Sequence, residues 1–112
     1  MRPRWLENKN VKKKSRLQEE RVAEEMGGKA HINSGATPFQ KGDGSTDDWL
    51  ISCKQTSHAS FSLTLRDLKE IEGQAKHIGK LPVMVIEFEK AGEEYAVIRK
   101  GEFLDYVRSL CN

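Results

Sequence analysis

An almost continuous apolar run, PVMVIEF, extends from Pro82 to Phe88 and narrows the choice of fold more than any other stretch. A strand with one solvated face alternates apolar and polar residues, so an unbroken run predicts a strand that is buried on both faces. The segment before it predicts an amphipathic helix with Thr64 as its N-cap, Asp67 at the third helical position and Gly79 at its end. A buried strand and a helix that covers it indicate an α/β fold.

Turn residues and apolar periodicity elsewhere predict the element order α-β-β-β-α-β-β-α, a central mixed β-sheet flanked by helices. No range is assigned to the second strand of this order. The other assigned elements are two helices and three strands, at Arg16–Met26, Glu102–Leu110, Lys29–Ile32, Trp49–Lys54 and Tyr95–Arg99. The residues of the last helix that we expect to face the core are Phe103, Leu104, Val107 and Leu110.

The charge of the chain is distributed unevenly along its 112 residues, a length that suits one domain. The first 16 residues carry seven lysines and arginines and one glutamate, whereas the remaining 96 carry 12 basic and 16 acidic residues. We therefore divide the chain into a basic arm, residues 1–14, and a domain, residues 15–112. The arm is expected to touch an anionic partner, and a solvated tail is the alternative; Trp5 favours a docked arm.

Two classes of protein are disfavoured by the sequence. No apolar run approaches the roughly 20 residues of a membrane span, and the basic N-terminus lacks the apolar core of a secretory signal. Cys53 and Cys111 are far apart and form no CxxC pair, so a cysteine zinc site is not expected. A reduced, buried Cys53 thiol and a cytoplasmic location are the simplest interpretation.

Glu19 has an unusual position on the first predicted helix, at the centre of the apolar face formed by Val22, Ala23 and Met26. A carboxylate directed into a core is costly unless something pairs with it. Glu19 therefore either reaches solvent at the edge of this short stripe or points at a metal ion or a lysine. Both interpretations stay open.

A second acid and a lysine follow at a suggestive spacing. Asp43 lies between two glycines, whose backbone adopts unusual dihedrals, although a turn aspartate is the commoner explanation of such a sequence. On the next predicted strand Ser52 and Lys54 share a face with Leu50. A lysine at the buried end of a strand is unusual core composition, and it raises the interest of the acid before it.

These residues, in this order, resemble the layout of PD-(D/E)XK nucleases, and within them most closely the archaeal and phage Holliday-junction resolvases. The resemblance extends over roughly residues 15–88 and depends on the ordered set rather than on any single motif. It implies a restriction-endonuclease-like fold. The catalytic residues that it implies are Glu19, Ser34, which lies in a Ser-Gly loop, Asp43 and Lys54.

The resemblance also implies a Mg²⁺ ion, with Mn²⁺ as a substitute. Such a cation polarises the phosphate and lowers the pKa of the attacking water, and it prefers oxygen ligands. The implied ligands are Asp43, Glu19, the side chain at position 52 and the backbone carbonyl beside it, at Cys53. Position 52 departs from the family pattern because Ser52 stands where the family has Glu or Asp.

Three explanations of Ser52 remain open. Another acid substitutes, with Glu72 on the following helix as the leading candidate and Asp47 and Asp48 next; or Glu19 and Asp43 suffice; or the site is inactive. The interpretation that we take forward is a dimeric, Mg²⁺-dependent endodeoxyribonuclease that resolves four-way DNA junctions, in the host cytoplasm if a phage encodes it. The alternatives are another nuclease of this superfamily, a DNA-binding protein with a degenerate site, and a small α/β interaction domain. The residues expected to contact DNA are Lys12, Lys13, Lys14, Arg16, Lys41, Gln55 and His58.

Overall fold

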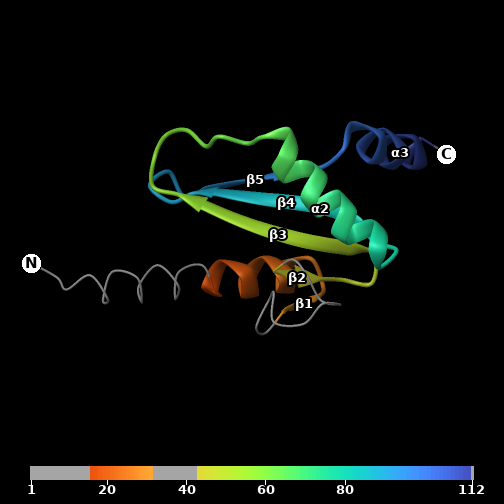
Figure 1. Ribbon diagram of the computed structural model, residues 1–112, viewed down its shortest axis with the longest axis horizontal. Helices are drawn as coiled ribbons and strands as arrows, with labels where there is room; N and C mark the ends of the chain where they lie inside the picture. Colours follow the sequence, from red (N-terminus) through yellow and green to blue (C-terminus); the bar gives the residue numbers. More distant parts are fainter. Residues whose placement is uncertain (1–15, 32–42, 112) are drawn as a thin grey trace, which may run out of the picture.

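The computed structural model describes residues 16–31 and 43–111, and this part of the chain is an α/β fold with one five-stranded sheet and three helices (Figure 1). The helices are residues 16–25, α2 (Leu65–His77) and α3 (Lys100–Leu110). The strands are β1 (Lys29–Ala30), β2 (Gly44–Ser45), β3 (Trp49–Thr56), β4 (Leu81–Phe88) and β5 (Glu93–Val97).

The sheet is mixed and its strands lie in sequence order, β1-β2-β3-β4-β5. β3 and β4 are parallel and pair over eight residues, whereas the other pairs are antiparallel. β2, the strand that had no assigned range, pairs with β3 through Gly44 and Ser45 alone. Within the described residues, the second half of β3 therefore extends beyond β2 on that side.

Two apolar clusters cover the two faces of the sheet. The first joins the N-terminal helix to the sheet and consists of Val22, Ala23, Ile51, Val83 and Val85. The second joins α2 to the sheet and consists of Leu50, Ile71, Ala75, Met84 and Ile86. Because β4 contributes two residues to each cluster, the prediction that this strand is buried on both faces is confirmed.

The predicted helix boundaries around α2 are confirmed by its cap. Thr64 accepts the backbone N–H of Asp67 and the Asp67 carboxylate accepts the N–H of Thr64, a complete capping box. At the other end Gly79 has φ +68°, a conformation that favours glycine. The following strand, β4, begins at Leu81, one residue before the predicted start at Pro82.

The C-terminal elements differ from the prediction. β5 begins at Glu93, two residues early, because Gly92 at φ +67° closes a tight turn in which its N–H bonds to the Phe88 carbonyl. Arg99 then becomes the N-cap of α3. The expectation that α3 faces the core is wrong: none of its residues is buried, and Figure 1 shows the helix projecting past the end of the sheet. No helix in the described residues has the length and apolar character needed to cross a membrane.

Candidate functional site

Asp43 is fixed where β2 begins, at the side of β3. Its backbone N–H bonds to the Ile51 carbonyl at 2.8 Å, and its own carbonyl accepts the His31 N–H at 2.9 Å. Its carboxylate Oδ2 accepts the backbone N–H of Cys53 at 2.6 Å. This contact lies beyond the two residues of β3 that pair with β2, so a side-chain oxygen satisfies a backbone N–H of β3 at this point.

Glu19 reaches the same region from the N-terminal helix. Val22 and Ala23 pack that helix on the face of the sheet that contains Ile51, and the Glu19 side chain is 17% exposed. Burial, followed by the negative charge of Asp43, raises the pKa of the Glu19 carboxyl, and Arg16 opposes the shift. The structure therefore directs Glu19 toward the sheet and places it close enough to Asp43 for repulsion.

Gln18 supplies another polar contact to the second half of β3. Its side chain is almost fully buried, and its Nε2 donates to the backbone carbonyl of Lys54 at 3.0 Å. Gln18 and Asp43 thus satisfy neighbouring backbone groups of β3 from outside the sheet. Sequence reasoning missed this contact, because it joins two residues that lie 36 positions apart in the chain.

The side chains of Ser52 and Lys54 leave β3 on the other face. Their partners in register on β4 are Met84 and Ile86, which belong to the cluster that α2 covers. Alternation along the strand therefore puts Ser52 and Lys54 opposite the face to which Glu19 is attached. Lys54 is exposed, and within the described residues its ammonium has no hydrogen bond or ion pair. The structure brings Glu19 and Asp43 together but does not bring the Lys54 side chain to them.

No acid of the described residues takes the place that Ser52 leaves open. Glu72 lies on α2, where its carboxylate pairs with Lys69 at 3.2 Å and with Arg99 at 3.4 Å. Asp47 and Asp48 are exposed in the turn before β3. Accordingly, no three His, Cys, Asp or Glu side chains of residues 16–31 and 43–111 are grouped so that they could hold a metal ion.

The Cys53 thiol is not a reactive group. It is half-buried against the first apolar cluster and forms no disulfide. Burial, together with the charges of Asp43 and Glu19, raises its pKa to about 12. A thiol that stays protonated is a poor metal ligand and a poor nucleophile, so only the backbone of Cys53 contributes to this site.

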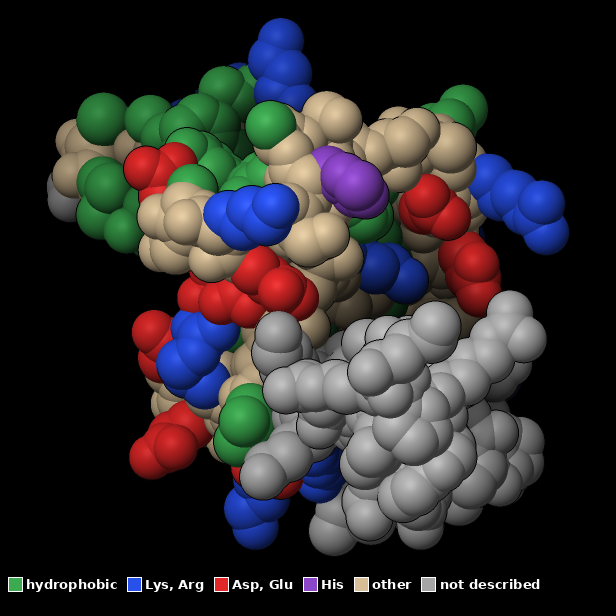
Figure 2. All heavy atoms as spheres, turned by 90° about the vertical axis from the view of Figure 1, so that its left-hand side faces the viewer, with side chains coloured by type: hydrophobic (Ala, Val, Ile, Leu, Met, Phe, Trp, Pro, Cys, Tyr) green, Lys and Arg blue, Asp and Glu red, His purple; other side chains and the backbone are tan. Residues whose placement is uncertain are grey.

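The predicted DNA contacts are distributed over several environments. Arg16 is engaged structurally, since it bonds to Glu20 and to the His31 carbonyl. Gln55 donates to Glu87 at 2.7 Å, and His58 is exposed. Ser34, Lys41 and the arm residues Lys12, Lys13 and Lys14 lie outside the described residues. Among the described residues visible in Figure 2, acidic and basic side chains are interleaved.

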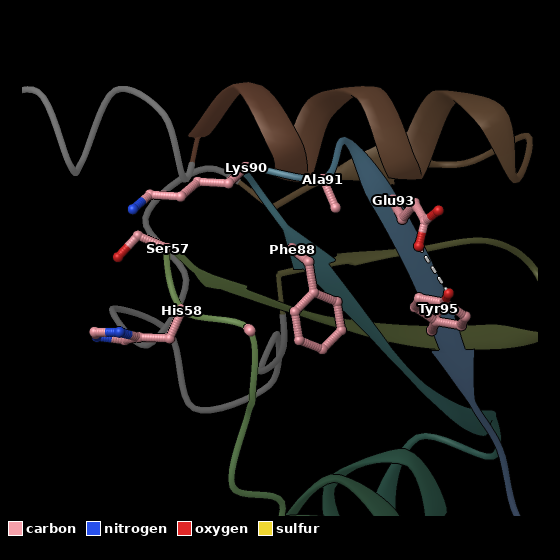
Figure 3. Close-up of a pocket in the computed structure, with 8 residues that line it drawn as sticks. Ser57, His58, Phe88, Lys90, Ala91, Glu93 and Tyr95 are labelled. Atoms are coloured by element: carbon pink, nitrogen blue, oxygen red, sulfur yellow. Dashed lines mark hydrogen bonds between the residues drawn. The ribbon is translucent and has the colours of Figure 1, made fainter.

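Sequence reasoning missed a pocket beyond the carboxyl ends of β3 and β4. It has a volume of about 590 Å³ and includes His58, Lys90, Phe88 and Tyr95 in its lining. The Phe88 and Tyr95 rings meet edge to face with centroids 6.0 Å apart, and the Tyr95 hydroxyl donates to Glu93. In Figure 3 the side chains of Lys90 and His58 extend toward the same side of this pocket. This pocket could have been predicted, because the carboxyl ends of two parallel strands meet at one edge of a sheet, where pockets commonly form.

Comparisons of the chain with protein-family models, with curated proteins and with solved structures find no match.

Proposed function

We propose that this protein is a metal-dependent endodeoxyribonuclease of the PD-(D/E)XK type that acts on branched DNA. The observation that carries the proposal is the pairing of Glu19 and Asp43 beside the backbone of Cys53. Two carboxylates that repel each other, held beside the backbone of β3, are suited to a cation. The order of elements, with a helix between two parallel strands after the acid, agrees with the resemblance.

The number of oxygen ligands at this site is at the lower limit of what binds Mg²⁺ in proteins. Mg²⁺ is commonly held by one or two carboxylates together with waters. Asp43 uses Oδ2 for the Cys53 N–H, and its Oδ1 accepts no hydrogen bond from the described residues. Glu19 supplies the second carboxylate and the Cys53 carbonyl a neutral oxygen. When bound, the cation polarises a phosphate and lowers the pKa of its water.

Each residue of the proposed site then has a separate role. Asp43 and Glu19 bind the cation, and the Cys53 N–H keeps the Asp43 carboxylate oriented. The resemblance assigns to the Lys54 ammonium the roles of offsetting the charge of the phosphate and positioning the water, although this side chain leaves β3 on the face opposite Glu19. Cutting a four-way junction on two strands requires two such sites, which a two-fold homodimer supplies. A cytoplasmic location belongs to the same proposal.

The test is cleavage of a synthetic four-way junction, compared with a plain duplex of the same sequence, with and without Mg²⁺. We expect paired, symmetric nicks in the junction alone. Asp43→Asn and Lys54→Ala should each lower the cleavage rate at least about 100-fold while junction binding persists. Lys76→Ala, an exposed lysine on α2, is the matched control and should cut normally. Full activity of Lys54→Ala would remove this lysine from the mechanism.

A second candidate is a DNA-binding protein whose nuclease site is inactive. Ser52 in place of an acid and the engagement of Glu72 on the other face of the sheet favour it. Calorimetry with Mn²⁺ separates the candidates. A nuclease binds the ion in a manner that Asp43→Asn and Glu19→Gln both weaken, whereas junction binding without any Mn²⁺ heat supports the inactive site.

A further inference from the structure

The pocket beyond the carboxyl ends of β3 and β4 lies on the face of the sheet that α2 covers. Phe88, at the end of β4, packs against the apolar cluster of that face, and Glu93 on β5 is its partner in register. The N-terminal helix with Glu19 packs on the opposite face, so this pocket is separate from the proposed cation site. Its volume of about 590 Å³ lies within the roughly 300–1,000 Å³ of pockets that hold small ligands.

Two aromatic rings contribute to the lining of the pocket. Phe88 and Tyr95 meet edge to face with an interplanar angle of 81°. In such a pair one ring directs its edge at the other, so other ring faces stay available for a third aromatic group. Tyr95 is 54% exposed. An exposed ring at a pocket suits a flat aromatic ligand, because side-chain rings and nucleobases stack through their π-faces.

Hydrogen-bond donors gather at one end of the pocket. Lys90 is exposed in the turn between β4 and β5, and its ammonium has no hydrogen bond or ion pair within the described part of the chain. Ser57 and His58 follow β3 and line the same pocket. In Figure 3 these three side chains lie on one side of the Phe88 ring. An ammonium, an imidazole and a hydroxyl at one end suit a phosphate group, whose oxygens are acceptors.

A carboxylate lies on the other side of the Phe88 ring. Glu93 is in this position in Figure 3, and its Oε2 accepts the Tyr95 hydroxyl at 2.9 Å. Its Oε1 accepts no hydrogen bond from the described residues. A glutamate oxygen can accept the exocyclic amino group of cytosine, whereas thymine has a carbonyl oxygen at that position. The pocket thus combines a phosphate end, an aromatic surface and an acceptor for an amino group.

We propose that this pocket binds a nucleotide whose base has an exocyclic amino group, with cytosine as the test case. The base stacks on Tyr95, and its amino group donates to Glu93. The phosphate accepts hydrogen bonds from Lys90, His58 and Ser57. A free nucleoside monophosphate and an unpaired nucleotide of a DNA strand present this same chemistry. A base inside a duplex does not, because its faces are stacked and its amino group is paired.

The test is a titration of the ¹⁵N-labelled, full-length protein with deoxycytidine monophosphate in EDTA, followed through the amide NMR shifts. We expect the largest shifts in residues 57–59 and 88–95. Deoxycytidine lacks the phosphate, and deoxythymidine monophosphate lacks the amino group, so each should bind at least about 5-fold more weakly. Phenyl phosphate has a ring and an anion but no base. Binding of phenyl phosphate or of the thymidine nucleotide as tight as that of deoxycytidine monophosphate would overturn the proposal.

Substitutions assign each part of the ligand to its side chain. Lys90→Ala should weaken binding of deoxycytidine monophosphate at least about 10-fold, and Tyr95→Leu at least about 5-fold. Glu93→Gln should remove the preference for cytosine over thymine, because its amide also donates to the thymine carbonyl. The matched control is Lys76→Ala, an exposed lysine in the last turn of α2, which should bind like wild type. The amide spectrum of each variant verifies that it is folded.

A single strand of deoxycytidines and a fully paired duplex distinguish the two sources of the nucleotide. Tighter binding of the strand than of the mononucleotide, with the same residues shifted, identifies unpaired DNA as the ligand. Equal affinity per nucleotide identifies the free nucleotide. If neither the strand nor the mononucleotide shifts the residues of the pocket, or if Lys90→Ala binds both as tightly as wild type, the proposal is wrong.

This site does not depend on the proposed nuclease activity, since EDTA removes any cation from Glu19 and Asp43 during the titration. If the protein cuts no junction but binds deoxycytidine monophosphate, only the nuclease proposal fails. If it cuts junctions and its pocket shows no nucleotide shifts, only the pocket proposal fails.

Discussion

The carboxylate of Asp43 accepts the backbone N–H of Cys53 at 2.6 Å, beyond the two residues of β3 that pair with β2 in the described part of the chain. One side chain thereby does two things: it accepts a backbone N–H of β3, and its charge raises the pKa of the Glu19 carboxyl. A residue with both roles affects stability and ligand binding together, and the following substitutions separate these effects.

Replacing Asp43 by alanine leaves the Cys53 N–H without its acceptor. The expected loss is about 1–3 kcal/mol in the free energy of unfolding, measured by urea denaturation. Asp43→Asn keeps an oxygen in place and should lose less, while it still weakens Mn²⁺ binding. If Asp43→Ala unfolds at the same urea concentration as wild type, the hydrogen bond has no structural role.

Replacing Glu19 by glutamine should stabilise the protein at neutral pH. Burial and the charge of Asp43 raise the pKa of the Glu19 carboxyl, so the folded state holds this proton more tightly than the unfolded state does. The wild type therefore loses stability as the pH rises from near 4.5 through the raised pKa, and Glu19→Gln escapes that loss. Melting temperatures at pH 7 and pH 4 check this: the gain should be present at pH 7 and shrink at pH 4.

The control for this comparison is Glu20→Gln, which changes an exposed carboxylate that pairs with Arg16. Exposed pairs contribute little, so its melting temperature should stay near the wild-type value at both pH values. A Glu19→Gln variant that melts below wild type at pH 7 would show that the ion pair of Glu19 with Arg16, at 3.6 Å, outweighs the cost of burying this carboxylate.

The two cysteines should differ in reactivity toward a thiol reagent such as DTNB. Cys111 is exposed, whereas the pKa of the half-buried Cys53 thiol is raised to about 12, which leaves almost no thiolate at pH 8. One equivalent should react quickly in the folded protein, and two after denaturation in guanidinium. Fast labelling of Cys53 in a folded Cys111→Ser variant would contradict the structure.

Two glycine substitutions should act in opposite directions. A Cβ on Gly28 would lie 2.0 Å from the Ser45 carbonyl oxygen, so Gly28→Ala must push β1 and β2 apart, at a cost of about 3 kcal/mol. Gly73 lies inside α2 with nothing within 4 Å of its Cβ position, and Gly73→Ala should add about 0.5–1 kcal/mol to the unfolding free energy. Chemical denaturation of both variants measures the signs.

Elements with a strong local signal could be predicted from the sequence. The capping pair Thr64 and Asp67 defines the start of α2 by short-range hydrogen bonds, and the apolar run of β4 needs cover on both faces whatever the rest of the chain does. Glu19 could be singled out too, because its place among apolar neighbours is a property of one helix.

The remaining features depend on contacts between distant segments. The two residues of β2 have no periodicity, and their pairing follows from the position of β3. The apolar residues of α3 have the pattern of a core helix, but the short link after Val97 carries them away from the body of the chain. The face from which Lys54 emerges likewise follows from the register of β3 against β4, which the residues themselves do not encode.

β3 pairs with β2 through two residues and with β4 through eight. This difference affects how often the site opens. Amide protons of the β1–β2 hairpin should exchange with deuterium long before those of β3 and β4, because so short a ladder opens locally without global unfolding. Asp43 belongs to the fast-opening part and Cys53 to the slow one. A ligand that binds to both Asp43 and Cys53 would stabilise this part of the sheet, and slower deuterium exchange in β1 and β2 would show that the ligand has bound.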